Sequence, residues 1–469
     1  MSIIFGTDGW RGLIGEDINE NSVCVAAQAF ADYLLSKFPS PSVIIGYDNR
    51  NFSKLFADAF AEVLSGNDIN SLVSDRIIPT PVVSFNVKQL GFSAGVMITA
   101  SHNPAKYNGI KFKSSFGSPF FTEETQLVEE LLYKTPIKRN NKKVKYINLF
   151  NEYLIKIHTL IDFNKIKTAN IQLLVDSMGG AGQQIIAKIL NGYCKVDTIY
   201  GIPSPDFYGR YAEPIEKNLL PLSAKLQENP IYSFGIANDG DADRIGIMLE
   251  NGNWLSAQET IFLITDYLIN KKKITGNLVK TSSVTDKLRT NFETSFRKVF
   301  DVQVGFKYIA EKMIYENIAF GCEESGGYGY ANHVPERDGI LSALIIAEML
   351  ADSGFFKLSE YVEEKRKMFG HIYYDRIDYI YEKENRTEIL PNLYNNPPKY
   401  IADYEVKKVE SFCSSRGVIN GIKFRLAGNP RWLLIRASET EPLVRFYAEA
   451  EDANEVKEIL LNGIKIING

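Results

Sequence analysis

The chain has 469 residues, which is too many for a single hydrophobic core and predicts roughly three or four domains. Hydrophobic residues make up 45% and charged residues 23% of the chain, as in ordinary soluble proteins. The formal net charge of −4 excludes a bulk basic surface for nucleic acid or an anionic membrane. An anionic substrate would therefore need a local cluster of Arg and Lys.

Targeting segments and covalent cross-links are not indicated by the sequence. The N-terminal MSIIFGTDGW has neither the charged nor the long apolar region of a signal peptide, and the most apolar helical run, GILSALIIAEML, is too short to span a bilayer. The four cysteines are widely spaced with no C-x-x-C pair, and the four histidines lack metal-ligand spacing. We expect a cytoplasmic protein with reduced thiols, without a disulfide framework or a zinc site.

One pattern recurs along the first three quarters of the chain: an apolar, β-branched run, a polar turn and an amphipathic helical stretch. It begins at SVIIGYDNR, again at IQLLVDSMGG and again at NLVKTSSVT. Such units predict α/β layers with largely parallel sheets, and their spacing of about 100 to 130 residues predicts three related domains rather than a solenoid. After HIYYDRID, short alternating strands and a final helix predict a smaller α+β domain.

Polar connectors give the candidate domain boundaries. KTPIKRNNKKVK is a basic linker candidate, and NGNWLSAQET marks a second change, where a hairpin turn gives way to a helix. The predicted domains, in chain order, are residues 1–145, 146–255, 256–370 and 371–469.

Two polar loops of the first domain carry candidate functional residues. FGTDGWRG places Arg11 after two glycine turns, and TASHNP places Ser101 and His102 directly after the apolar run AGVMI. The hexapeptide alone has two interpretations, because Ser, Asn and Pro also suit an ordinary strand-to-loop turn. In the following AKYNGIKFK, Lys111 and Lys113 lie two residues apart, so both side chains point to the same face of a strand.

The sharpest local signal is NDGDADRIG, which places Asp239, Asp241 and Asp243 at every second position. Three carboxylates this close repel one another unless a cation lies among them, and oxygen ligands favour Mg²⁺. An EF-hand is disfavoured because Arg244 stands at the sixth position, which needs glycine, and because the flanking segments alternate like strands. A solvated acidic turn is the remaining alternative, but Arg244 beside the carboxylates favours a cation site for phosphoryl transfer.

Two later loops are rich in polar groups. In GCEESGGYG, Glu323 and Ser325 lie on a glycine-rich loop that suits recognition of polyol hydroxyls, with a solvent-exposed charged loop as the alternative. RASETEPLVR suits a phosphate clamp, with a surface turn held by an ion pair as its alternative. The clamp candidates are Arg436, Ser438, Thr440 and Arg445.

Together these motifs resemble those of the α-D-phosphohexomutase family. The match runs from FGTDGWRG through TASHNP, DGDADR and GCEESGG to RASETEPLVR, and so covers nearly the whole chain. The resemblance implies an α/β protein of four domains around a central cleft. Three related α/β domains with mixed sheets would be followed by a smaller C-terminal α+β domain.

The resemblance also implies a role for each motif. Ser101 would carry a phosphoryl group as phosphoserine, and one Mg²⁺ ion, held by the three aspartates of DGDADR, would contact that phosphate. Glu323 and Ser325 would recognise sugar hydroxyls. The residues that line the reacting centre would be Arg11, His102, Lys111 and Arg244. Further substrate-binding candidates are Lys280, His333, Arg436, Ser438, Thr440 and Arg445.

The implied reaction is the interconversion of a hexose 1-phosphate and a hexose 6-phosphate. Phosphoserine 101 would donate its phosphoryl group to the 6-hydroxyl, and the resulting 1,6-bisphosphate, which also serves as activator, would return its 1-phosphate to the serine. His102 and Lys111 are both candidates for the general base, and the sequence does not choose between them. We expect a monomer or homodimer that acts on a small sugar phosphate, with no nucleic acid or membrane partner.

The sugar is predicted from departures within the motifs. Related bacterial dual mannose/glucose enzymes carry His directly after the SG of the sugar loop, where this chain has Gly327, and EESGG followed by VPERDG resembles phosphoglucomutases. Glucosamine phosphate mutases commonly read FGTDGIRG, where this chain has Trp10. We therefore expect a phosphoglucomutase, with a phosphomannomutase or dual-specificity enzyme second and a phosphoglucosamine mutase third.

Two other classes of function remain as alternatives. A metal-dependent serine phosphatase would need a second metal or an activated water, and the sequence has one carboxylate cluster. A sugar-phosphate-binding protein with an inactive site would be expected to lack the serine or an intact DGDADR, and this chain keeps both. A NAD-linked enzyme is disfavoured because SMGGAG lacks the full G-x-G-x-x-G spacing.

Overall fold

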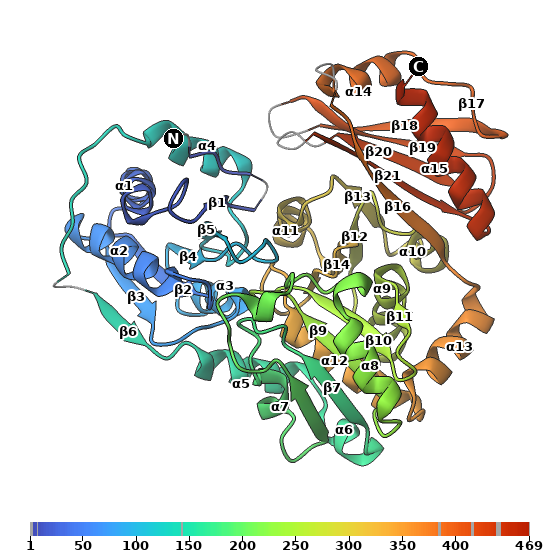
Figure 1. The fold of residues 1–469 in the computed structure, drawn as a ribbon, viewed down its shortest axis with the longest axis horizontal. Coiled ribbons are helices and arrows are strands. Elements are labelled where there is room, and N and C mark those ends of the chain that lie inside the picture. The colour runs from blue at the N-terminus through green and yellow to red at the C-terminus, as the bar shows by residue number, and fades with distance from the viewer. Residues whose placement is uncertain are drawn as a thin grey trace. The chain divides into compact units, whose positions relative to one another are not determined.

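The computed structural model describes residues 3–6, 8–141, 144–382, 386–413, 417–437 and 442–468. The chain divides into two compact units: Met1–Thr275 with Gly305–Glu364, and Gly276–Val304 with Lys365–Gly469. Successive α/β segments and a last antiparallel sheet follow one another along the chain (Figure 1).

The first sheet has six strands in the order β1-β5-β4-β2-β3-β6. Strands β4, β2, β3 and β6 run parallel; β5 pairs antiparallel with β4, and β1 pairs antiparallel with β5 and so runs in the direction of β4. Because β6 belongs to this sheet, the domain boundary predicted at residue 145 falls inside a strand. The strands are β1 (Trp10–Leu13), β2 (Ser42–Tyr47), β3 (Asn70–Ser74), β4 (Ala94–Ile98), β5 (Tyr107–Ser114) and β6 (Lys145–Ile147).

Helices cover both faces of the first sheet. On one face α1 and α2 pack together, and Phe30 stacks on Phe112 of β5 with ring centroids 4.3 Å apart. On the other face α3 contacts β2 and β4, where a Cβ on Gly46 would lie 2.4 Å from Val83. This close packing holds β2 and β4 in place, and the loop that follows β4 carries Ser101. The helices are α1 (Glu20–Lys37), α2 (Ser53–Gly66), α3 (Thr80–Gln89) and α4 (Thr122–Leu131).

The second sheet has five strands in the order β11-β10-β9-β7-β8, of which β9, β7 and β8 are parallel. Its strands are β7 (Gln172–Asp176), β8 (Lys195–Ile199), β9 (Phe234–Asn238), β10 (Ile245–Leu249) and β11 (Trp254–Leu255). The helices of this segment are α5 (Phe150–Leu160), α6 (Phe163–Ala169), α7 (Ile185–Ile189), η1 (Phe207–Gly209), η2 (Glu216–Asn218) and α8 (Leu220–Glu228).

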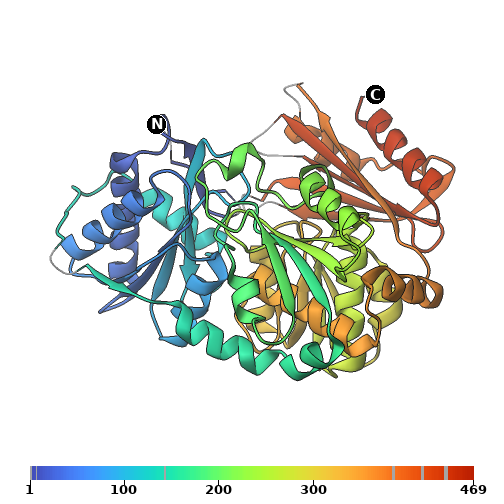
Figure 2. The ribbon, with the colours of Figure 1, turned by 60° about the horizontal axis from the view of Figure 1, so that its bottom comes forward.

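The rest of the first unit is built on an antiparallel strand pair and a buried helix. The apolar run GILSALIIAEML lies in α12, which contacts α6, α7, α9, β9 and β10 (Figures 1 and 2). The elements are α9 (Ala257–Asp266), η3 (Tyr267–Lys271), α11 (Phe306–Tyr315), β14 (Ile318–Cys322), β15 (Tyr328–Tyr330) and α12 (Gly339–Ser353); α13 (Leu358–Phe369) follows.

The second unit combines a parallel strand pair with a six-stranded antiparallel sheet, in the order β16-β21-β20-β19-β18-β17. Helix α15 packs on β16, β20 and β21, and its apolar side is buried against the sheet. The elements are β12 (Asn277–Thr281), α10 (Lys287–Phe292), β13 (Val299–Val302), β16 (Tyr373–Ile380), α14 (Arg386–Asn395), β17 (Tyr400–Ile401), β18 (Tyr404–Cys413), β19 (Ile419–Leu426), β20 (Trp432–Ala437), β21 (Leu443–Ala450) and α15 (Ala453–Asn468).

The α/β class with mixed sheets and a C-terminal α+β segment is confirmed. In the first sheet β2 pairs in parallel with β3 and β4, and β3 with β6, whereas antiparallel pairs lie at one side of each of the first two sheets. The short connections β4–β5 and β9–β10 return the chain beside the preceding strand, which makes these two pairs antiparallel. These returns matter for the site, since the loops at β4–β5 and β9–β10 carry its central residues.

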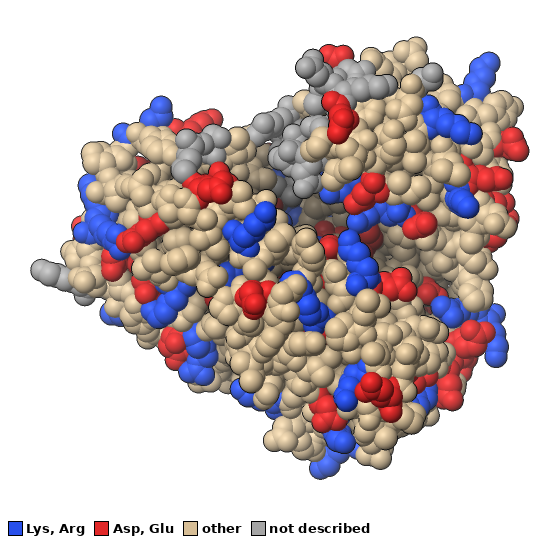
Figure 3. Space-filling view, viewed as in Figure 1, with Lys and Arg blue, Asp and Glu red and all other residues tan. Residues whose placement is uncertain are grey.

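The distribution of charged side chains on the surface agrees with the small net charge of the sequence. On the face seen in Figure 3, basic and acidic side chains are interspersed, as expected from the small net charge. Within the described ranges, no single helix is long and apolar enough to cross a membrane. The pair α12 and α13, bent by 76°, passes that test by length and composition only.

Candidate active site

Ser101 lies just beyond the end of β4, in a backbone conformation that an ordinary turn would give to glycine or asparagine. Its φ is +52°, and the residue is fully buried. The backbone amide of Ser101 donates to Thr99 Oγ1 at 2.9 Å, and Arg50 Nη2 donates to the carbonyl of Ser101 at 2.7 Å. A strained, buried serine held on both sides is typical of a functional site rather than a surface turn.

The aspartate loop between β9 and β10 meets this serine. Ser101 Oγ donates to Asp239 Oδ2 at 2.9 Å, and Asp239 Oδ1 accepts from the backbone amides of Asp243 and Arg244 at 3.0 and 3.1 Å. A Cβ on Gly240 would lie 2.4 Å from the carbonyl oxygen of Ser101, so only glycine allows this approach. The flanking strands also agree with the exclusion of an EF-hand, which is bracketed by helices.

The three aspartates fit a hard divalent cation. Each offers a carboxylate oxygen within 4.8 Å of the others, and all three residues are buried. Asp241 Oδ1 and Asp243 Oδ1 are buried without a hydrogen-bond partner, which is costly unless a cation or water approaches them. Burial, with the charges of Asp243 and Asp241, raises the pKa of Asp239 well above its ordinary value. This mutual repulsion is what a bound cation would relieve.

Lys111 supplies fixed positive charge on the other side of the aspartates. Its buried Nζ lies 2.8 Å from Asp241 Oδ2, 3.0 Å from Asp243 Oδ2 and 3.1 Å from Asp8 Oδ2. Burial alone would lower the pKa of Lys111, but the three carboxylates raise it well above its ordinary value. The carboxylates therefore favour the charged, ammonium form of Lys111. The hydroxyl of Thr80 also donates to Asp241 Oδ2, at 2.6 Å.

His102 and the two predicted arginines border the serine. His102 Nδ1 lies 3.4 Å from Ser101 Oγ. Burial, followed by the charges of Arg244, Arg11 and Lys111, holds the pKa of His102 well below its ordinary value. Arg11 Nη1 donates to Asn103 Oδ1 at 2.6 Å, and Arg244 Nε lies 3.7 Å from Asp243 Oδ1. The structure thus brings all five predicted residues of the reacting centre together.

The predicted sugar loop joins the same cluster. It follows β14, and the amide of Ile245 donates to the carbonyl of Gly326 at 3.0 Å, which ties it to the aspartate loop. Ser325 Oγ donates to Glu323 Oε1 at 2.6 Å. Burial raises the pKa of Glu323, against the lowering effect of Arg337 and Arg244.

Arg337 is a central residue that sequence reasoning missed. Its Nη2 lies 2.5 Å from Asp8 Oδ2 and 2.9 Å from Asp243 Oδ2, and its Nη1 lies 3.5 Å from Glu323 Oε1. One guanidinium thus connects the N-terminal, aspartate and sugar loops. In the sequence, VPERDG indicates only a resemblance to phosphoglucomutases, and FGTDGWRG is noted for Arg11 rather than for Asp8. The signal that could have identified Arg337 is an arginine next to an acidic residue in a polar loop.

Arg337 also fills the space beside Gly327. A Cβ at Gly327 would lie 2.4 Å from Arg337 Cδ and 2.9 Å from Glu323 Oε1. A side chain at position 327 would therefore collide with Arg337 and Glu323 as they lie in this structure.

His333 is not brought into this cluster. Its ring is buried, with Nε2 2.9 Å from Asp338 Oδ2, and it stacks on Phe85 with centroids 5.8 Å apart. Asp338 in turn accepts from Tyr153 and from the backbone amide of Leu341 at the start of α12. These contacts describe a packing residue, and they give no support to the predicted substrate role.

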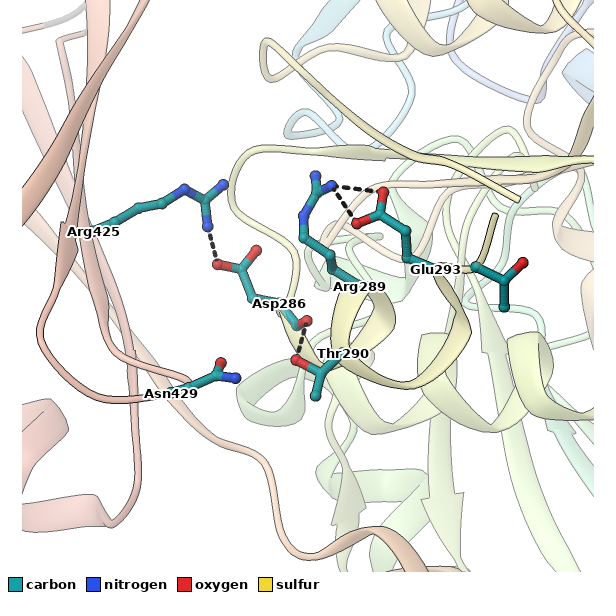
Figure 4. Close-up of a pocket in the computed structure, with 7 residues that line it drawn as sticks. Asp286, Arg289, Thr290, Glu293, Arg425 and Asn429 are labelled. Atoms are coloured by element: carbon teal, nitrogen blue, oxygen red, sulfur yellow. Dashed lines mark hydrogen bonds and ion pairs between the residues drawn. The ribbon is translucent and has the colours of Figure 1, made fainter. Parts of the chain in front are cut away.

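Lys280 belongs to an ion-pair cluster within the second unit. Its buried Nζ lies 2.7 Å from Asp301 Oδ1 and 3.1 Å from Asp286 Oδ1. Arg425 of β19 also reaches both carboxylates, and Figure 4 shows its side chain directed at Asp286 beside Arg289. Lys280 is thus fully engaged by protein carboxylates, which leaves its predicted substrate role without structural support.

The predicted phosphate clamp lies in the second unit and is described in part. Ser438 and Thr440 lie outside the described residues. Arg436 on β20 and Arg445 on β21 are direct cross-strand partners, so both side chains share one face of the sheet. Arg445 Nε lies 3.7 Å from Asp378 Oδ2, and Arg436 Nε is buried without a hydrogen-bond partner. Two like charges side by side are an arrangement that an anion would stabilise.

Comparison with known proteins gives matches along nearly the whole chain. The alpha/beta/alpha domain I of phosphoglucomutase/phosphomannomutase matches residues 2–137, domain II matches 151–252, domain III matches 256–369, and the C-terminal domain matches 396–462.

Individual relatives carry different substrate names. A phosphoglucomutase/phosphomannomutase of Thermococcus kodakarensis is 29% identical over 476 residues, covering 100% of this chain and 99% of the relative. A phosphoglucosamine/phosphogalactosamine mutase of Sulfurisphaera tokodaii is 28% identical over 495 residues, covering 100% of both. The crystal structure of a Thermus thermophilus protein, provisionally assigned as a phosphomannomutase, has a TM-score of 0.85 at 32% identity and covers 100% of both chains.

Proposed function

Because the chain belongs to the phosphoglucomutase/phosphomannomutase family, an enzyme family of phosphohexomutases, we propose that it interconverts glucose 1-phosphate and glucose 6-phosphate through a phosphoserine at Ser101. The observation that carries this proposal is the 2.9 Å contact between Ser101 Oγ and Asp239 Oδ2, in a loop whose other two aspartates each keep a buried oxygen without a partner. That arrangement suits a hydroxyl that carries a phosphoryl group next to a cation.

The cation proposed for this site is Mg²⁺, held by Asp239, Asp241 and Asp243. It would spread the negative charge that develops on the phosphoryl group during transfer. The basic residues around the cation site have a different role, which is to neutralise its carboxylates. Lys111 and Arg337 neutralise Asp8 and Asp243, which keeps the carboxylates in place when no phosphate is bound.

Transfer breaks the bond between phosphorus and Ser101 Oγ and forms a bond between phosphorus and the 6-hydroxyl of the sugar. The proton of that hydroxyl passes to a nitrogen base, for which the site offers His102 and Lys111. The carboxylates around Lys111 raise its pKa and favour its protonated form, whereas the lowered pKa of His102 favours a neutral imidazole that can accept a proton. The reverse transfer from the 1-position of the hexose 1,6-bisphosphate restores phosphoserine. Glucose 1,6-bisphosphate would also phosphorylate a dephosphorylated enzyme.

Sugar selection is proposed to depend on Glu323, Ser325 and the space beside Gly327. Gly327 lacks the histidine side chain that dual-specificity relatives carry at this position, and the proposed preference for glucose over mannose phosphate rests on the absence of that hydrogen-bonding group. The Arg436 and Arg445 pair, with Ser438 and Thr440, would hold the phosphate that does not react. Mannose phosphate is the second candidate, because two of the similar proteins carry that substrate in their names.

The test is a coupled assay on glucose 1-phosphate, mannose 1-phosphate and glucosamine 1-phosphate, each with Mg²⁺ and a trace of the matching 1,6-bisphosphate. We expect the highest kcat/KM for glucose 1-phosphate and complete loss of turnover in Ser101→Ala. A higher kcat/KM for mannose or glucosamine phosphate would overturn the assignment of the sugar. Release of free phosphate without isomerised sugar would make the protein a phosphatase.

A further inference from the structure

A second polar cavity, separate in its residues from the catalytic cluster, lies in the first unit. Its volume is about 490 Å³, and its walls come from α3, α5, α11, β14, β15 and the loop after β15. This volume falls within the range of small-molecule sites, about 300–1,000 Å³. The lining residues that matter here are Phe85, Lys88, Lys156, Asn317, Asn332 and His333.

The cavity carries positive charge that the protein leaves uncompensated. Among the described residues, neither Lys88 nor Lys156 has a carboxylate within ion-pair distance, and Lys88 Nζ donates only to the backbone carbonyl of His333, at 3.0 Å. Glu316, the carboxylate at the wall, forms an ion pair with Lys312 at 3.5 Å. Burial, followed by the charge of Lys156, lowers the pKa of Lys88. An anion between the two ammonium groups would remove this repulsion.

The remaining wall combines hydrogen-bonding and apolar groups. Asn317 and Asn332 present amides, and Phe85 gives an aromatic surface that is stacked on the buried ring of His333. His333 Nε2 is bound to Asp338, while its Nδ1 is buried without a hydrogen-bond partner. A few polar groups on a partly apolar wall are typical of a site for a small organic ligand.

We propose that this cavity binds a small oxyanion, a phosphate or carboxylate group carried on a compact body, with Lys88 and Lys156 as its charged contacts. Both lysines lie on helices that line the recess, Lys88 near the end of α3 and Lys156 on α5. The proposal needs none of the residues assigned to phosphoryl transfer. It therefore stands or fails independently of the mutase function.

The first experiment measures lysine reactivity at single residues. The full-length protein is acetylated with a limiting N-hydroxysuccinimide ester in the presence of citrate, inorganic phosphate or sodium chloride at equal ionic strength, and each lysine is quantified by peptide mass spectrometry. The protein is freed of divalent cations by treatment with a chelating resin beforehand, so that metal chelation by citrate has no effect and no other carboxylate is present. Lys167, an exposed lysine on α6 outside the cavity, is the internal control.

At an anion concentration ten times its dissociation constant, the acetylation of Lys88 and Lys156 should slow about tenfold relative to chloride, whereas Lys167 should not change. Comparing the protection by citrate with that by inorganic phosphate shows whether the cavity prefers a carboxylate or a phosphate group. Equal rates at Lys88 and Lys156 in all three salts would overturn the proposal.

The second experiment uses calorimetric titration of the anion that protects better. The double variant Lys88→Gln/Lys156→Gln should bind that anion at least about tenfold more weakly, which corresponds to roughly 1.4 kcal/mol. Lys167→Gln, a matched loss of one lysine charge, should bind as the wild type does. Unchanged affinity in the double variant would show that the anion binds elsewhere and would overturn the proposal.

Discussion

The substitution Lys111→Met tests whether the charge of Lys111 stabilises the carboxylates of the site. Lys111 Nζ contacts Asp8, Asp241 and Asp243 within 3.1 Å, and its side chain is 1% exposed. Methionine keeps the length and the apolar stem but leaves three buried carboxylates with one cation fewer. Removing one partner of a buried ion pair costs about 3–5 kcal/mol, and we expect a loss of unfolding free energy in that range.

A divalent cation should restore part of the unfolding free energy that Lys111→Met loses. Mg²⁺ would reach the same aspartates through the buried oxygens that have no hydrogen-bond partner, Asp241 Oδ1 and Asp243 Oδ1. In the wild type it competes with the charge of Lys111, so the stabilisation by Mg²⁺ should be larger in Lys111→Met. A ligand at 100 times its dissociation constant stabilises by about 2.7 kcal/mol, which sets the size of the effect to be resolved.

Lys113→Met is the matched control. Lys113 lies two residues further along β5, is equally buried and binds Glu336 rather than the aspartates. Denaturant unfolding of the three proteins, each in EDTA and in Mg²⁺, gives the required comparison. Lys113→Met should lose stability, but its response to Mg²⁺ should equal that of the wild type. The reasoning is refuted if Lys111→Met loses less than about 1 kcal/mol, or if Mg²⁺ stabilises all three proteins equally.

Three further predictions follow from single contacts. Gly327→Ala should cost about 1–3 kcal/mol of stability and lower kcat/KM, because its Cβ would lie 2.4 Å from Arg337 Cδ; wild-type unfolding and kinetics would contradict the role given to Arg337. His333→Gln should lower the melting temperature but leave kcat/KM and the glucose-to-mannose ratio near their wild-type values, whereas a changed ratio would restore its substrate role. Burial lowers the pKa of Lys423 to about 8, so the folded state releases its proton before the unfolded state does. Wild-type stability relative to Lys423→Met should therefore rise by up to about 3 kcal/mol between pH 7 and pH 10, measured by denaturant unfolding; a constant difference would contradict this.

The sequence was sufficient for those parts of the site that depend on local patterns. Ser101 after AGVMI, the aspartates between two alternating segments and Glu323 after ENIAF all lie where strand-to-loop patterns place them. The three loops follow β4, β9 and β14, which belong to different sheets, so the patterns indicated each loop at a strand end but not that the loops meet. Local patterns were also enough for the α/β class and for the smaller C-terminal segment.

What the sequence could not supply were contacts between distant loops and the environment of each charge. Arg337 meets Asp8 across more than 300 residues, and no local spacing indicates that pair. Lys280 and His333 are polar residues near motifs, but their burial and their pairing with Asp301 and Asp338 depend on tertiary packing. The local patterns indicated parallel strands, and the antiparallel pairs β4–β5 and β9–β10 depend on where the chain returns, which those patterns do not show.

The central claim is that Ser101 carries the phosphoryl group that is exchanged with the sugar. The most direct measurement is peptide mass spectrometry of the protein after incubation with glucose 1,6-bisphosphate and Mg²⁺, alongside turnover of glucose 1-phosphate. We expect one phosphoryl group on the peptide with Ser101, lost when glucose 1-phosphate is added in excess, and neither label nor turnover in Ser101→Ala. Isomerisation with Ser101 unmodified, or turnover that persists in Ser101→Ala, would contradict it.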